Sequence, residues 1–145
     1  MAKKSMKLGN GRVRTLGRWK FLVWEKLSRL TRLKAKNHCQ RCGKWKETKK
    51  MQAHHLVPKS QGNYARFCED NIVSLCHYCH HRWWHGQSVW EDQRDLIEKW
   101  IGLTRYQEIK FLSNKRHSYT EEEYDVMLKD LTKRVKEIEA EGEVV

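Results

Sequence analysis

The sequence lacks several features that define large classes of proteins. No apolar run approaches the roughly 20 residues that a membrane-spanning helix needs, so we expect a soluble protein with no membrane partner. No signal peptide is recognisable at the basic N-terminus, which favours a reducing, cytoplasmic location. The sequence has no internal repeat and no low-complexity segment. Hydrophobic residues make up 39% of the 145 residues, so we predict a modest core that needs a metal ion to stabilise it.

Acidic residues are scarce in the first third of the chain. Residues 1–50 carry 17 Lys and Arg against 2 Asp and Glu, a net charge of +15, while the complete chain carries +12. Such a basic block suits a polyanion, because each phosphate that it neutralises releases counterions. We therefore expect a polyanion as the partner. The alternative interpretation is a basic tail that is only solvated.

The five cysteines form a pattern that is typical of metal binding. Four of them make two CxxC pairs, Cys39 with Cys42 and Cys76 with Cys79. Two intervening residues let both thiolates of a pair bind one tetrahedral zinc ion, so we predict a structural Zn²⁺ shared by all four. This zinc would clamp the ends of the chain between the pairs. The fifth cysteine, Cys68, is predicted to be a small, partly buried residue without chemistry.

Two adjacent histidines, His54 and His55, lie between the cysteine pairs. Neighbouring residues of a β-strand point to opposite sides of the backbone. One histidine can therefore face a metal ion while the other is held apart and acts on a water molecule. This pattern indicates a hydrolytic metal site.

The hydrophobic pattern predicts an α+β fold. Apolar residues at helical spacing from Trp19 to Leu33 predict a basic amphipathic helix. Residues 51–57 and 72–75 are predicted to be two short strands, and a helix that begins near Cys79 completes a small ββα motif. Gly43 is predicted to allow the backbone turn after the first cysteine pair. The predicted division of the chain is a disordered basic arm (1–17), a basic helix with a zinc-stapled core (18–86) and a helical C-terminal extension (87–145).

Three helices are predicted in the C-terminal extension. Each follows a Ser or Thr that has Glu or Gln three residues later, which is the capping-box pattern. The three pairs are Ser88 with Glu91, Thr104 with Gln107, and Thr120 with Glu123, the last flanked by the aromatic residues Tyr119 and Tyr124. We expect the tryptophans to pack in the core rather than to stack on bases; these are Trp83, Trp84, Trp90 and Trp100.

The order of these motifs resembles that of zinc-stapled HNH endonucleases with a ββα-metal site. Within residues 38–86, the first CxxC pair is followed by His54-His55, Pro58, Asn71-Ile72 and the second CxxC pair with His80. The spacing is also similar to that of the bacteriocin DNases, in which a histidine follows the Asn by nine residues. Further matches make nearly the whole chain resemble the NinG-type (Rap) recombination nucleases of lambdoid phages. These matches are Arg66-Phe67, Leu96-Ile97, Ile101-Gly102 and Thr120-Glu121-Glu122.

The resemblance implies a metal-dependent HNH endonuclease that hydrolyses phosphodiester bonds of duplex or branched DNA. It would act in phage recombination, repair or packaging in the host cytoplasm. His54 and His80 would bind the catalytic divalent ion, Mg²⁺ or Mn²⁺, with Zn²⁺ or Ni²⁺ as alternatives. His55 would be the general base, and Asn71 would tie the two strands together and orient His55 through its amide. His85 is a candidate third ligand, although it follows His80 by five residues where the bacteriocin spacing is four.

Two alternatives stay open at this point. His81 lies four residues before His85 and could pair with it instead of leaving it to the metal ion. The whole chain could also be a non-catalytic, zinc-dependent nucleic-acid-binding module. In either case the predicted DNA contacts are Arg12, Arg14, Arg18, Lys20, Arg29, Arg32 and Lys59. The sequence leaves open whether the chain acts as a homodimer.

Overall fold

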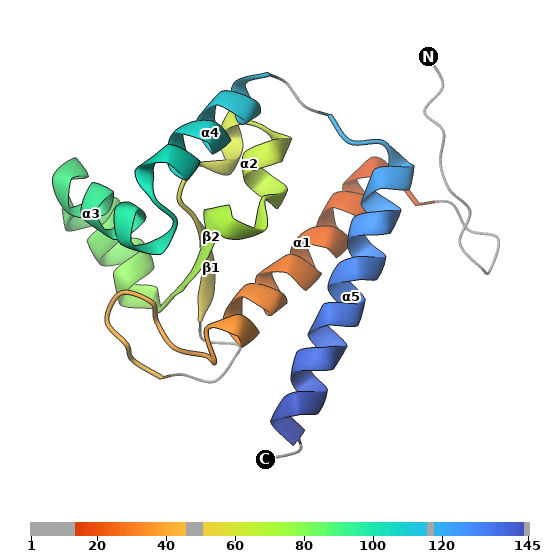
Figure 1. Cartoon of the computed structure of the whole chain (residues 1–145), viewed down its shortest axis with the longest axis horizontal. Helices are drawn as coiled ribbons and strands as arrows, with labels where there is room; N and C mark the ends of the chain where they lie inside the picture. The colour runs from red at the N-terminus through yellow and green to blue at the C-terminus, as the bar shows by residue number, and fades with distance from the viewer. Residues whose placement is uncertain (1–13, 46–50, 116–117, 144–145) are drawn as a thin grey trace.

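A two-stranded antiparallel hairpin lies at the centre of the molecule (Figure 1). The computed structural model describes residues 14–45, 51–115 and 118–143. Strand β1 spans Gln52–His55 and strand β2 spans Ile72–Leu75. In the register between them, His54 lies opposite Val73 and His55 lies opposite Ile72. Both predicted strands are therefore present, and the first is shorter than the pattern indicated.

The two faces of this hairpin pack against different cores. Val73 and Leu75 belong to one buried cluster, which is shared with the cysteine pairs and the helices that follow β2. Ile72 belongs to a second cluster, which is shared with the first and last helices of the chain. The alternation of side chains along a strand produces this division. It also places His54 and His55 toward different halves of the molecule.

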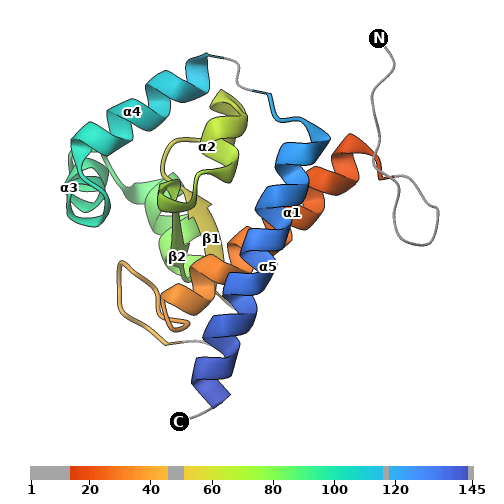
Figure 2. The same cartoon turned by 45° about the vertical axis from the view of Figure 1, so that its right-hand side comes forward.

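Helices α1 (Leu16–Lys34) and α5 (Glu121–Glu143) lie side by side and run in the same direction (Figures 1 and 2). The N–H of Glu123 donates to Thr120 Oγ1 and the N–H of Thr120 donates to the Glu123 carboxylate, which confirms the predicted capping box. Helix α1 begins at Leu16 after a Thr15 cap. The last residues of the predicted arm, 1–17, therefore belong to α1 and its cap. Residues 1–13 of the arm lie outside the described part of the chain.

The connection between the strands contains helix α2 (Asn63–Phe67) between two single turns, η2 (Lys59–Gln61) and η3 (Glu69–Asn71). The sequence pattern indicated no helix between the two predicted strands. Helix α4 (Leu103–Asn114) packs against this connection, and helix α3 (Trp90–Trp100) lies against the other end of α4 (Figure 1). The two capping boxes predicted for them are wrong, because the N-cap residue of neither helix makes a side-chain hydrogen bond. Ser88 donates instead to the Trp84 carbonyl oxygen at 2.7 Å.

The helix that follows β2 is a π-helix, η4 (Tyr78–Gln87). It completes the predicted ββα order, but its hydrogen bonds close over five residues rather than four. At its end, the N–H of Ser88 donates to the carbonyl oxygen of Trp83 at 2.7 Å. The small sheet among helices confirms the predicted α+β class. Among the described residues, no helix combines the length and the apolar character that crossing a membrane requires.

Candidate active site

Four cysteine side chains form a cluster beside the hairpin, the four-cysteine cluster. The Sγ atoms of Cys39, Cys42, Cys76 and Cys79 lie within 4.8 Å of one another. Four sulfurs arranged tetrahedrally around zinc at about 2.3 Å would lie about 3.8 Å apart. The Sγ atoms of Cys42 and Cys76 are 3.8 Å apart, so the cluster fits a structural zinc ion.

The backbone around Cys39 favours its thiolate form. The N–H of Cys42 points at Cys39 Sγ at 3.5 Å, and the N–H of Cys79 points at Cys76 Sγ at 3.4 Å. Burial alone would raise the pKa of Cys39, but the surrounding backbone N–H groups outweigh it and lower this pKa to about 7. Gly43 adopts a φ of 77°, as predicted for the turn after the first pair. Cys68 lies outside the cluster and donates to Asp70 Oδ1 at 2.8 Å.

A second cluster contains three histidines. One ring nitrogen each of His54, His80 and His85 lies within 4.8 Å of the others. In an α-helix, five residues turn through about 500°, which would leave His80 and His85 about 140° apart. The π-helix removes this mismatch, because residues five apart lie nearly above one another when hydrogen bonds close over five residues. His80 and His85 are five residues apart, so the π-helix places both side chains on the same face of η4.

His81, the alternative partner of His85, lies outside the histidine cluster. The His81 ring is exposed and lies 4.6 Å from the His77 ring and 4.3 Å from the His80 ring, measured between centroids. His81 is not one of the three clustered histidines. His85 therefore joins His54 and His80.

The histidine cluster has the chemistry of a metal site. His80 Nδ1 donates to Gln52 Oε1 at 2.6 Å, which leaves the lone pair on Nε2. His54 is 4% exposed, and its buried Nε2 has no hydrogen-bond partner within the described chain. A buried polar atom without a partner is costly unless something else binds it. Gln52 was not predicted, although it lies two residues before His54 and so on the same face of β1.

Burial and repulsion by neighbouring histidines keep His54 and His80 neutral. The pKa of His54 is lowered to about 3, first by burial and then by the neighbouring histidines, of which His80 has the largest effect. The pKa of His80 is lowered to about 4, again mainly by burial. Both imidazoles are therefore uncharged at neutral pH, which is the form that binds metal ions.

His55 lies on the opposite face of β1 and makes different contacts. Its Nε2 lies 2.9 Å from the carbonyl oxygen of Arg66, so this nitrogen carries the proton and donates it. Its ring stacks on Trp24 of α1, with centroids 4.8 Å apart and planes at 20°. Burial lowers the pKa of His55, and the charges of Lys59 and Arg66 lower it further, against the effect of the hydrogen bond. His55 is thus a neutral imidazole that carries its proton on Nε2, so Nδ1 keeps its lone pair.

Asn71 is fully buried and fixes the chain on both sides of this arrangement. Its Oδ1 accepts from the N–H of Val57 at 2.8 Å, and its Nδ2 donates to the carbonyl oxygens of Val57 and Ala65, both at 2.9 Å. Asn71 makes no direct hydrogen bond to His55, so the prediction that its amide orients His55 is wrong. It holds Ala65, the residue before Arg66, and so acts on His55 through the backbone that binds it.

His55 and the three clustered histidines line the same cavity, which has a volume of about 390 Å³. The three clustered histidines, His54, His80 and His85, are called the histidine triad. They reach the cavity from β1 and η4, while His55 reaches it from the other face of β1. Trp24 and Lys59 complete the part of the wall nearest His55. Trp24 was not predicted, because no local pattern shows which residue of α1 packs against β1.

The comparison with protein families gives one match. The model of the family described as bacteriophage lambda NinG protein matches residues 2–141. The chain belongs to the NinG family. No curated protein and no solved structure matches it. The family match confirms the predicted relationship to the NinG-type proteins and to bacteriophages.

The basic residues predicted to contact DNA have different environments in this NinG family member. Lys59 is exposed at the histidine cavity, and Arg18 is exposed at the start of α1. Arg29 is paired with Glu139 of α5, with Nε 2.8 Å from the carboxylate. The others are half-buried on α1 or just before it, namely Arg14, Lys20 and Arg32. Arg12 lies outside the described residues.

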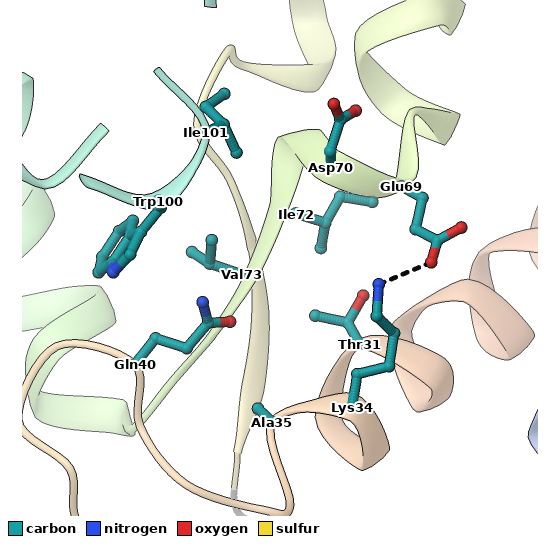
Figure 3. Close-up of a pocket in the computed structure, with 10 residues that line it drawn as sticks. All are labelled: Thr31, Lys34, Ala35, Gln40, Glu69, Asp70, Ile72, Val73, Trp100 and Ile101. Carbon is teal, nitrogen blue, oxygen red and sulfur yellow. Dashed lines mark hydrogen bonds and ion pairs between the residues drawn. The ribbon is translucent and has the colours of Figure 1, made fainter. Parts of the chain in front are cut away.

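Another cavity, of about 340 Å³, lies along the outer edge of β2 between the ends of α1 and α3 (Figure 3). Its charged side chains already have partners. Glu69 accepts from Arg134 and from Lys34, which holds the pKa of its carboxyl group at about 2. Asp70 is paired with Arg105 at 2.6 Å. The charged side chains of this cavity are therefore paired, whereas His54 in the histidine cavity has a buried Nε2 without a partner in the described chain.

Proposed function

We propose that this NinG family member is a metal-dependent DNA endonuclease of the HNH type that acts in phage recombination. One observation carries the proposal. The adjacent residues His54 and His55 leave β1 on opposite faces and still line the same cavity, one in a histidine triad and one apart from it. A zinc-dependent binding module has no use for a neutral, separately held imidazole next to a metal site.

His55 is proposed to act as the general base. The Arg66 carbonyl oxygen takes the Nε2 proton, so Nδ1 keeps its lone pair and can accept a proton from an attacking water molecule. The stacked Trp24 ring restricts the orientation of the imidazole. A positioned base of this kind contributes about 10²- to 10⁴-fold to the rate.

The triad of His54, His80 and His85 is proposed to hold the divalent ion. When bound, such an ion polarises the phosphate and stabilises the departing 3′ oxygen. Gln52 fixes the proton of His80 on Nδ1, and the partnerless Nε2 of His54 is available as a ligand atom. The four-cysteine cluster is proposed to hold zinc and to fix the end of β2 against the start of η4.

Positive charge around His55 suits a phosphodiester substrate. Lys59 and Arg66 are close enough to His55 to lower its pKa, so both charges act at the cavity. Residues 1–50 add a net charge of +15, which would neutralise further phosphates. The substrate class that fits these charges is DNA, in duplex or branched form.

The test is cleavage of matched duplex, single-stranded and four-way-junction DNA in the presence of Mg²⁺, Mn²⁺, Zn²⁺ or Ni²⁺. We expect metal-dependent cleavage that chelation abolishes, with the junction cut faster than the duplex. Tight DNA binding without cleavage under any of these ions would instead identify a zinc-dependent binding module. Equal rates on duplex and junction would leave an endonuclease without the branched-DNA preference.

A further inference from the structure

The π-helix η4 is an unusual element for a metal site to depend on. Helices with hydrogen bonds over five residues are rare and occur mostly as single turns, whereas η4 spans Tyr78–Gln87. The α-helical alternative would separate His80 from His85, as shown above. Contacts from outside η4 must therefore favour hydrogen bonds over five residues rather than over four in this segment.

Arg41 makes two such contacts. It lies inside the first CxxC pair, and its Nη1 is 3.3 Å from Cys79 Sγ in the first turn of η4. Its guanidinium carbon also lies 3.5 Å from the centroid of the Trp83 ring, one turn further along η4. One side chain of the first cysteine pair thus holds the π-helix at two points.

The chemistry of Arg41 suits both contacts. Four thiolates around Zn²⁺ leave a net charge of −2, which favours a cationic donor beside the sulfur atoms. The guanidinium is planar, so it can donate along its edge to Cys79 while its face lies on the Trp83 ring. A lysine ammonium could supply the charge near the sulfur but not the flat stacking on the indole.

The contact continues from Trp83 to the histidine triad. The ring centroids of Trp83 and Trp84 are 6.0 Å apart, and those of Trp84 and His54 are 4.7 Å apart. Trp84 is buried in the core, so its ring cannot move freely. A shift of Trp83 would therefore be transmitted to the face of η4 that carries His80 and His85.

We propose that Arg41 is a positioning residue that holds η4 in its five-residue register and so couples the four-cysteine cluster to the histidine triad. The proposal rests on the proposed function only in taking the triad as a metal site. It does not require that the protein cleaves DNA.

The experiment compares Arg41→Ala, Arg41→Lys and Trp83→Leu with the wild type, each as the full chain with zinc in the four-cysteine cluster. Arg82→Ala is the matched control, because Arg82 is an exposed arginine of the same helix. Two quantities are measured without DNA. The first is the rate at which a chromogenic chelator removes zinc. The second is the affinity of the triad for added Co²⁺, followed by calorimetry and by the visible spectrum of the bound ion.

Each variant has a distinct expected result. Arg41→Ala should lose zinc faster and bind Co²⁺ about 10- to 100-fold more weakly, which is the usual effect of removing a group that supports metal ligands. Arg41→Lys should restore slow zinc release but not Co²⁺ affinity. Trp83→Leu should bind Co²⁺ weakly with zinc release close to that of the wild type. Arg82→Ala should match the wild type in both quantities.

Several results would overturn the proposal. One is Co²⁺ affinity within twofold of the wild type in both Arg41→Lys and Trp83→Leu. Another is a wild-type triad that binds no Co²⁺. If Arg41→Ala does not fold, the other two variants still decide the question. A wild-type protein that binds Co²⁺ at the triad but cleaves no DNA would refute the proposed function and leave the role of Arg41 to be judged by the same affinities.

Discussion

His54 should reduce the stability of the protein when no divalent ion is bound. Its side chain is 4% exposed, and its Nε2 has no hydrogen-bond partner in the described chain. A buried polar atom left unpaired costs about 1–3 kcal/mol. Leucine has a similar volume and no polar atom. We therefore expect His54→Leu to raise the free energy of unfolding by about 1–3 kcal/mol at pH 7.

The difference should grow as the pH falls. Burial lowers the pKa of His54 to about 3 in the folded protein, whereas an unfolded histidine has a pKa near 6.5. Between these values the unfolded chain binds more protons than the folded one, so acid favours unfolding in this window. Linkage gives a loss of about 2 kcal/mol between pH 7 and pH 5 for the wild type. His54→Leu lacks this loss, so its advantage should reach about 3–5 kcal/mol at pH 5.

The assay is urea denaturation of zinc-loaded protein at pH 7, 6 and 5, with and without Mn²⁺. Any weakening of the four-cysteine cluster by acid affects wild type and variant alike, so the difference between them isolates His54. His38→Ala, which alters an exposed histidine, should keep the pH dependence of the wild type. Mn²⁺ at 100 times its Kd should add about 2.7 kcal/mol to the wild type only. A His54→Leu protein less stable than the wild type at every pH without Mn²⁺ would refute this reasoning.

Three further predictions concern other parts of the chain. Metal analysis after washing with EDTA should find about one tightly held zinc per chain, unchanged in Cys68→Ser; a folded, zinc-free protein would contradict the assignment of the four-cysteine cluster as a zinc site. Gly62→Ala should lower the free energy of unfolding by about 1–3 kcal/mol in urea denaturation, because Gly62 has a φ of 145° and a Cβ there would lie 2.6 Å from the Ser113 carbonyl oxygen. Gly17→Ala is its control, since a Cβ at Gly17 meets nothing within 4 Å, and it should not destabilise the protein. Deleting residues 1–13 removes four basic side chains and should reduce the slope of duplex-binding affinity against salt concentration by up to about 3.6. The deletion should weaken binding to a four-way junction more than binding to a duplex and leave turnover at saturating DNA unchanged. Equal losses of affinity on both substrates would count against the branched-DNA preference.

The hairpin and the four-cysteine cluster could be predicted because they depend on short-range geometry. The CxxC spacing places two sulfurs on one ion wherever it occurs, and strand alternation separates His54 from His55 without reference to the rest of the fold. The Thr120 capping box was predictable for the same reason. The Ser88 box failed because the Ser88 hydroxyl donates to the end of η4, and the sequence pattern does not show that competing acceptor.

The parts that could not be predicted depend on contacts between distant segments. The π-register of η4 has no signal in helical periodicity, and only the five-residue interval from His80 to His85 hints at it. Trp24 reaches His55 because α1 crosses the hairpin, which no pattern within α1 indicates. Asn71 was expected to tie the motif together, and its bonds to Val57 and Ala65 could be assigned only from the fold.

The central claim is that His55 accepts a proton from water beside a metal ion held by the triad. The most direct test is single-turnover cleavage of supercoiled plasmid by His55→Ala, with Mn²⁺ and saturating protein, alongside measurements of zinc content and DNA affinity. We expect a rate about 10²- to 10⁴-fold below that of the wild type, with zinc content and DNA affinity retained. His38→Ala should cleave at the wild-type rate. Cleavage by His55→Ala at the wild-type rate would contradict the assignment of His55 as the base.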